Sequence, residues 1–582
     1  MNVLSEYAPK EQFEDISASI FQEIAQNHIF LGDYNSAEKL FIDSLKIKKN
    51  LFGINDIEVA ITFDNLGSTN IYQGKYNIAE KNFLKALKIK EKILNDDDER
   101  IFDTTNNLYA LYSQLGDYDK AELKAKKAIN FANKYFNKND PKLALSKNNL
   151  GYIFLIKGKY NLSKNLFLDS INILKNTIGE NHLETLMVKS NLAKFYILKG
   201  DYKEAENILV SNLEIIKNKN GDNDITTAEF ESLLADLYFE IDLYRKAEDL
   251  YLISFNTKKG LLKPESRELV KMRNRLGMLY TKQGKYEEAE EIYKEALLSY
   301  KTDSENNEIL VSSVLNNLYV VLLKQGKLEE AKSQLIRSKK ITEQSVGKKN
   351  SFYITIISNL GHLNRIQRRY KKAQLFDEEA LELSKNYLAE NKLLISNILN
   401  NMAVNYIGQN LFLEAEPYLL EAFNIRKKIL GNNHAETNQI SINLAFIYSL
   451  IDQENKIEPY AYEGLKGIFS LIQKETQYLA LNSREQFLES MRSSYMSPFQ
   501  WALNSKSGAR MALFSRLNHQ GLLQDIEKKQ SQIARESISQ DSNFKEISKI
   551  VSQLSSYELS QELRDRLTKR KSILEKKLPS IK

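Results

Sequence analysis

The sequence predicts an all-α solenoid built from about eleven helical hairpins of 42 residues each. The stretch "NLGSTNIYQGKYNIAEKNF" (Asn65–Phe83) returns 42 residues later as "NLYALYSQLGDYDKAELKA" and again as "NLGYIFLIKGKYNLSKNLF". The composition favours helix, with 42% hydrophobic residues and only 7 prolines in 582 residues. No insertion or deletion interrupts the register, which indicates one structural unit stacked many times.

A small residue marks the same point of most repeats, and we call this position the anchor. Stepping by 42 residues gives the anchors Gly32, Gly74, Gly116, Gly158, Gly200, Asp242, Gly284, Gly326, Arg368, Asn410 and Asp452. An aromatic or large apolar residue follows two positions later in nearly all repeats, and Ala or Ser follows five positions later. Apolar residues on both sides of Gly74 recur at helical spacing, so two helices are expected to meet there at a left-handed residue.

One polar position recurs nine residues before the anchor. We call it the asparagine ladder: Asn65, Asn107, Asn149, Asn191, Asn317, Asn359, Asn401 and Asn443. Leu233 and Arg275 interrupt the ladder. Asn costs roughly 0.5 kcal/mol of helix propensity relative to Ala, so a compensating interaction is expected at each position. Two interpretations stay open: the amides hold the main chain of a bound peptide, or they bond to the neighbouring repeat and stitch the array.

Other polar groups give weaker signals. The stretch "NRIQRRYKK" places Arg365, Arg368 and Arg369 at a turn between helices, either as a contact for an acidic partner or as a solvated basic turn. His182 and His434 occupy the same position six periods apart, which favours a role in the loop over catalysis.

The composition argues against several function classes. With no cysteine, no glycine-rich phosphate loop and no nucleophile motif, we expect no enzyme, no cofactor and no metal site. The 82 basic and 76 acidic side chains are mixed along the chain, so we expect no nucleic-acid partner. No apolar run reaches 18 residues and the start lacks the layout of a signal peptide, so we expect no membrane partner and a cytoplasmic location.

The offsets of glycine, aromatic residue, alanine and leucine resemble tetratricopeptide repeats. The 42-residue period, with the loops "GENHLET" (Gly179–Thr185) and "GNNHAET" (Gly431–Thr437), resembles the kinesin-light-chain subtype. The resemblance implies a right-handed α-solenoid in which the asparagine ladder lines a concave groove and binds a peptide or protein partner. We expect an N-terminal lead at residues 1–13, the solenoid at residues 14–458, and a C-terminal helical cap or connector at residues 459–582.

The segment after residue 458 resembles a second context. "RLNHQGLLQDI" (Arg516–Ile526) is similar to the connector that follows the repeats in bacterial tetratricopeptide–CHAT proteins, whose CHAT domain is a caspase-like peptidase. The resemblance implies the sensor part of such a system, without the peptidase itself, since the chain stops where that domain would begin and has no cysteine. The alternative is a stand-alone adaptor that links two protein partners. The sequence names neither the partner nor the oligomeric state.

Overall fold

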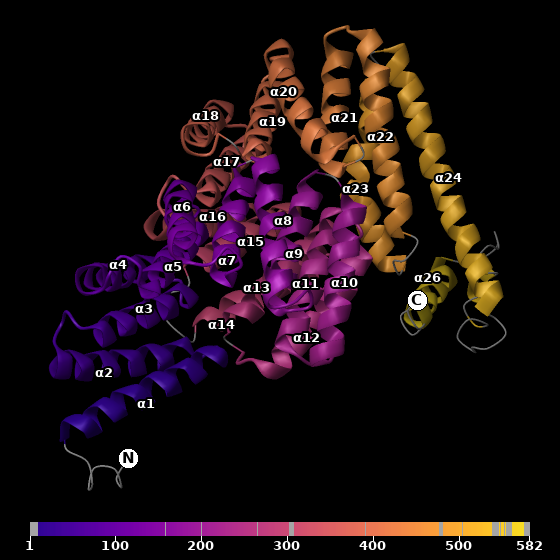
Figure 1. Cartoon of the computed structure of the whole chain (residues 1–582). Coiled ribbons are helices and arrows are strands. Elements are labelled where there is room, and N and C mark those ends of the chain that lie inside the picture. The colour runs from indigo at the N-terminus through magenta and orange to yellow at the C-terminus, as the bar shows by residue number, and fades with distance from the viewer. Residues whose placement is uncertain are drawn as a thin grey trace. The chain divides into compact units, whose positions relative to one another are not determined.

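The computed structural model describes residues 10–575 except 158, 200, 265, 302–307, 390, 433, 477–480, 503–504, 538–545, 547–548, 552 and 555–560. Within these residues the chain is helical and contains no strand, and consecutive helices form hairpins (Figure 1). The all-α solenoid fold expected from the repeats is therefore confirmed. The break expected near Ser555–Ser560 and the residues before Lys10 lie outside the described residues.

Eleven successive helix pairs follow the repeat register through the described residues. The first helices are α1 (Lys10–Phe30), α3 (Ile57–Tyr72), α5 (Glu99–Leu115), α7 (Pro141–Ile156), α9 (Leu183–Lys199), α11 (Ile225–Glu240), α13 (Arg267–Lys282), α15 (Glu308–Lys324), α17 (Ser351–Ile366), α19 (Lys392–Gly408) and α21 (Ala435–Leu450). The second helices are α2 (Tyr34–Phe52), α4 (Tyr76–Ile93), α6 (Tyr118–Tyr135), α8 (Tyr160–Thr177), α10 (Tyr202–Asn220), α12 (Tyr244–Leu261), α14 (Tyr286–Lys301), α16 (Leu328–Ser345), α18 (Tyr370–Tyr387), α20 (Phe412–Leu430) and α22 (Glu454–Thr476). The helices α23 (Leu481–Trp501), α24 (Lys506–Ser537) and α26 (Gln561–Glu575) follow.

The anchor residues end the first helices in the left-handed conformation, as predicted. Gly74 has a φ of 77° and Gly116 a φ of 69°. The positive-φ residues other than glycine in the described part are all anchors: Asp242, Arg368, Asn410 and Asp452, with φ between 56° and 60°. The turn therefore keeps its geometry even where the side chain disfavours it, because packing of the two flanking helices over-determines it.

Small residues allow the two helices of a hairpin to approach closely. The residue five positions after the anchor has no exposed surface in any repeat, including Ala79, Ser163 and the terminal Ile457. The Leu eight positions before the anchor is buried from Leu66 onward. Its counterpart in α1, Ile24, is 41% exposed, because this first described hairpin has a described neighbour on one side only.

A capping position lies eighteen residues before the anchor, at the start of the first helix. Asp98 accepts a hydrogen bond from the backbone N–H of Arg100 (3.0 Å), and Asp140 accepts one from Lys142 (2.8 Å). His434 Nδ1 accepts the N–H of Glu436 at 3.2 Å, and His182 Nδ1 accepts that of Glu184 at 3.4 Å. The two histidines therefore cap helices, which agrees with the loop role expected from their shared position.

The described chain divides into two compact units. The first contains residues from 1–237, 249–278 and 288–401. Within it, hairpins far apart in sequence touch: Lys263 Nζ lies 2.6 Å from Asp33 Oδ2, and Arg267 Nη2 donates to Tyr76 Oη at 3.1 Å. Asn350 also donates from its side chain to the carbonyl oxygen of Leu115. These contacts supplement the stacking of neighbouring hairpins.

The second unit contains residues from 238–248, 279–287 and 402–582. Helices α22, α23 and α24 pack together in it, and α23 also packs on α21. Ser494 on α23 donates to Gln439 Oε1 on α21 at 2.7 Å, and the Trp501 side chain is fully buried. The boundary expected at residue 458 falls inside α22.

Candidate functional site

The asparagine ladder lies on the first helices of the hairpins. Its described side chains are partly exposed except Asn149, which is 8% exposed. Exposed apolar side chains stand one helical turn away on the same helices. Leu145 (46% exposed) lies four residues before Asn149, and Met187 (44%) lies four residues before Asn191. Residues at this spacing share a helix face, so amide and apolar groups are presented together.

Five ladder amides donate a hydrogen bond to the preceding repeat. The acceptor lies 43 residues earlier in each case, at the position just before the equivalent ladder residue. The bonds are Asn149 Nδ2 to Asn106 Oδ1 (3.3 Å), Asn191 to Asn148 (3.0 Å), Asn317 to Asn274 (2.9 Å), Asn359 to Asn316 (2.7 Å), and Asn401 to Ser358 Oγ (2.8 Å). The ladder therefore joins neighbouring repeats in the way that the stitching interpretation expects.

These bonds use only part of each amide. An Asn amide has two N–H donors and a carbonyl oxygen with two lone pairs. The amide oxygens of Asn191, Asn317, Asn359 and Asn401 have no protein hydrogen-bond donor among the described residues. The donated bond fixes the orientation of the amide and leaves a donor and an acceptor for another molecule. Stitching and ligand contact are compatible in one side chain.

The remaining ladder positions differ. The acceptor position facing Asn107 is Asp64, and its carboxylate instead binds Lys90 Nζ (2.5 Å) and Thr104 Oγ1 (2.8 Å). Asn443 accepts a long hydrogen bond from Gln439 at 3.4 Å. Asn65 contributes its backbone carbonyl to Thr69 Oγ1 at 2.8 Å.

The interruption of the ladder carries charge. Arg275, at a ladder position, donates from Nη2 to Asp236 Oδ2 at 3.0 Å. Asp236 Oδ1 accepts a second bond from Tyr251 Oη at 2.6 Å. An ion pair therefore replaces the amide-to-amide bond in this part of the array.

The basic turn expected as a contact for an acidic partner is split by the fold. Arg368 and Arg369 are exposed. Arg365 is 6% exposed, and its Nη1 pairs at 2.5 Å with Asp377 Oδ2, which is fully buried. Arg365 is therefore part of the hairpin core and does not present its charge to a partner on this surface. Sequence spacing alone missed this, because Arg365 occupies a position that holds Ile71 in the second repeat.

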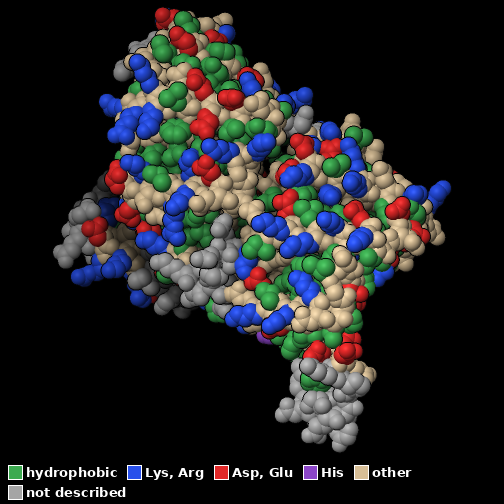
Figure 2. All heavy atoms as spheres, turned by 90° about the vertical axis from the view of Figure 1, so that its left-hand side faces the viewer, with side chains coloured by type: hydrophobic (Ala, Val, Ile, Leu, Met, Phe, Trp, Pro, Cys, Tyr) green, Lys and Arg blue, Asp and Glu red, His purple; other side chains and the backbone are tan. Residues whose placement is uncertain are grey.

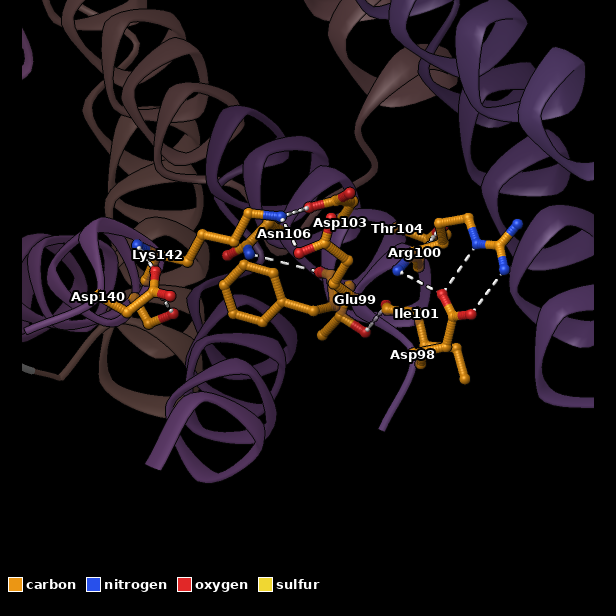
Figure 3. A network of polar contacts seen from close by, with 12 residues as sticks. Asp98, Glu99, Arg100, Ile101, Asp103, Thr104, Asn106, Asp140 and Lys142 are labelled. Carbon is orange, nitrogen blue, oxygen red and sulfur yellow. Dashed lines mark hydrogen bonds and ion pairs between the residues drawn. The ribbon is translucent and has the colours of Figure 1, made fainter. Parts of the chain in front are cut away.

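The acidic loop before α5 serves the fold (Figure 3). Asp98 caps α5 and accepts from the guanidinium of Arg100 at 2.9 and 2.6 Å. Lys142 Nζ lies 3.0 Å from Glu99 Oε2 and 3.5 Å from Asp103 Oδ1. In the part of the chain that the structure describes, no group of three or more His, Asp or Glu side chains is arranged to hold a metal ion.

The mixed charge of the sequence is visible on the molecular surface. On the face shown in Figure 2, Asp and Glu side chains stand among the Lys and Arg side chains, with hydrophobic side chains between them. Every helix within the described residues is too short or too polar to span a bilayer.

Repeated helical hairpins with this register define the class of protein. Models of the tetratricopeptide repeat match residues 17–92, 70–134, 142–218, 184–254 and 310–386, and a second tetratricopeptide-repeat model matches residues 269–302 and 396–436. These matches cover more than half of the chain, so it belongs to the tetratricopeptide-repeat family. A comparison with curated proteins found no match.

Several solved structures are similar in fold. BtubC (BKLC) from P. vanneervenii is 22% identical over 42% of this chain and 92% of its own, with a TM-score of 0.32. A kinesin light chain from Podosopora anserina with nearly identical TPR-like repeats is 17% identical over 35% of this chain and 98% of its own (TM-score 0.31). A Rap protein complexed with Competence and Sporulation Factor is 13% identical over 64% of this chain and 99% of its own (TM-score 0.46).

Proposed function

We propose that this protein is a non-catalytic scaffold that binds an extended peptide or protein segment along the first helices of its hairpins. The observation that carries the proposal is the fixed orientation of the ladder amides. Each of five amides is held by one hydrogen bond to the preceding repeat and keeps an unused oxygen or N–H. A preorganised amide loses little entropy when it binds a peptide group. One such amide in each repeat suits a periodic main chain.

The exposed apolar neighbours support the same proposal. Leu145 and Met187 stand one turn from ladder amides, where they would contact side chains of the bound segment. Four successive ladder positions on each side of the interruption would span roughly ten extended residues, given helix spacings of about 8–10 Å and a rise of about 3.3 Å per residue.

The proposed biological setting is the cytoplasm, with the chain as the sensor part of a tetratricopeptide–CHAT system. In this proposal the solenoid occupies residues 14–458, and residues 459–582 form the cap or connector. A stand-alone adaptor is the alternative. The intact mass of the endogenous protein separates them in part: a mass well above 67.2 kDa favours a fused peptidase, and a mass of 67.2 kDa directs the search to a separate partner chain.

The central experiment compares two triple variants that lose the same three hydrogen bonds. The donor variant is Asn317→Ala, Asn359→Ala and Asn401→Ala. The acceptor variant is Asn274→Ala, Asn316→Ala and Ser358→Ala. Both remove the bonds between repeats, but only the donor variant removes the ladder amides. A random decapeptide display library is selected on the wild-type chain, and the affinity of the enriched peptide for all three proteins is measured by fluorescence anisotropy.

We expect the donor variant to bind at least about tenfold more weakly than the acceptor variant, since it loses hydrogen bonds worth about 1 kcal/mol each. Circular dichroism melts confirm that both variants are folded. Equal weakening in the two variants would show that the amides only stitch repeats. Failure of the wild-type chain to enrich any peptide would refute the proposed function itself.

A further inference from the structure

The interruption of the asparagine ladder brings five charged side chains together, and we call them the charged cluster. They come from the first helices of three consecutive hairpins, all within the first compact unit. They are Lys194 on α9, Glu229 and Asp236 on α11, and Lys271 and Arg275 on α13. Sequence periodicity shows only that Asn is absent at Leu233 and Arg275. The structure shows what stands there instead.

Four members of the cluster have a partner of opposite charge. Arg275 pairs with Asp236 at 3.0 Å, and Glu229 pairs with Lys258 at 2.6 Å. Lys271 pairs with Glu268 at 2.7 Å. Lys194 has no carboxylate within ion-pair distance among the described residues, and its Nζ lies 5.7 Å from the centroid of the Tyr152 ring. One cation in the cluster is therefore uncompensated.

The cluster is recessed but open to solvent. The side chains of Asp236 and Arg275 are 36% and 28% exposed. Desolvation nevertheless raises the pKa of Asp236, in spite of the opposing charge of Arg275. A carboxyl group that reaches water and is still desolvated must be surrounded by protein on most sides. Electrostatic attraction in such a recess is stronger than on an open surface, because the effective dielectric constant is lower.

We infer that the charged cluster binds an acidic side chain, Asp or Glu, of the peptide held by the ladder. The ammonium group of Lys194 is the principal donor, and the guanidinium of Arg275 lies beside it. This inference rests on the proposed function. A chain that contacts both Asn191 and Asn317 has to pass this interruption, where no amide is available to hold it. The acidic residue would then fix which part of the peptide lies at the centre of the array.

The test uses the full chain and a random sixteen-residue display library. Selections are run on the wild type, on Lys194→Gln, on Lys194→Glu and on the control Lys88→Gln, an exposed lysine of α4. Wild type and control should enrich peptides with an acidic residue at a constant place. Lys194→Gln should lose that enrichment, and Lys194→Glu should enrich Lys or Arg instead, since Glu229 and Asp236 then dominate.

A peptide from the wild-type selection is then measured with its acidic residue intact or changed to the amide. We expect Lys194→Gln and the peptide substitution each to weaken binding at least about tenfold, and the two effects not to add, because they remove the same ion pair. Wild-type peptides without acidic enrichment, or fully additive effects, would overturn the inference and leave the proposed function standing. If no peptide is enriched on any of the proteins, the proposed function falls, and the inference with it.

Discussion

A buried ion pair in the repeat anchored at Arg368 offers a test of how the hairpin core is built. In three other repeats, a glycine seven positions before the anchor packs against an aromatic ring: Gly67 with Phe83, Gly151 with Phe167, and Gly277 with Tyr293. In this repeat the equivalent Gly361 meets Asp377, and Arg365 pairs with that carboxylate. Arg and Asp thus take the places that Ile71 and Phe83 take in the second repeat.

Separating the two charges should be costly. Asp377→Phe leaves the buried guanidinium without a partner and should lower the free energy of unfolding by about 3–5 kcal/mol. Arg365→Ile should cost less at acidic pH, since Asp377 can take up a proton and an arginine cannot lose one. The double variant Arg365→Ile, Asp377→Phe restores the apolar pair. We expect it to equal the wild type or to exceed it by up to about 4 kcal/mol.

The assay is thermal and urea unfolding of the four proteins, with hydrogen exchange read in α17 and α18. Local exchange is needed because repeat arrays open in parts, so a global transition can hide the change. Recovery of α17 and α18 protection in the double variant would confirm the pairing. A double variant as unstable as Asp377→Phe alone would refute the reasoning, because lost packing would then explain the cost.

The same pair predicts a pH dependence. Burial raises the pKa of Asp377 from its usual 3.8 to about 7, although Arg365 acts in the opposite direction. The folded chain therefore holds this proton more tightly than the unfolded chain. The contribution of Asp377 to stability should fall as pH rises from about 4 to about 7 and stay constant above that. The difference in stability between the wild type and the double variant should change over this window, and its absence would contradict the assignment.

Three further predictions concern the turns, the caps and the ladder. Arg368→Gly relieves a left-handed residue with a φ of 57° and should raise the melting temperature, by an amount matching roughly 1–2 kcal/mol, whereas Gly74→Ala should lower it. Asp98→Ala removes the cap of α5 and should cost about 1 kcal/mol, seen as faster hydrogen exchange in α5, while Asp98→Asn should retain protection. The donor variant of the ladder should lose about 3 kcal/mol from three hydrogen bonds and regain about 1.5 kcal/mol of helix propensity, a net loss of about 1.5 kcal/mol in urea unfolding.

Local features of the fold follow from residue types at fixed spacing. The helix pairs, the left-handed anchors and the buried alanines were all predicted in register, because each depends on the conformational preference or size of one residue type. Gly74 and Ala79 are examples. Even Asp242 and Arg368, which break the glycine pattern, adopt the predicted turn conformation.

The candidate site was only half predictable. The periodicity identified the ladder positions, but not their acceptors, which lie 43 residues away and so fall out of register by one position. Asn359, for example, bonds to Asn316 and not to the equivalent Asn317. A comparison of equivalent positions cannot find a contact between non-equivalent ones.

The sequence by itself determined the unit, its length, its turn geometry and the recurrence of one amide per repeat, because local conformation and helical periodicity depend on near neighbours in the chain. Only the tertiary structure decided which side chains meet. It placed Arg365 in the core with Asp377, and it brought Lys194, Asp236 and Arg275 together from three hairpins. Hydrogen bonds and ion pairs form between atoms a few ångströms apart, and that proximity exists only after the repeats have stacked.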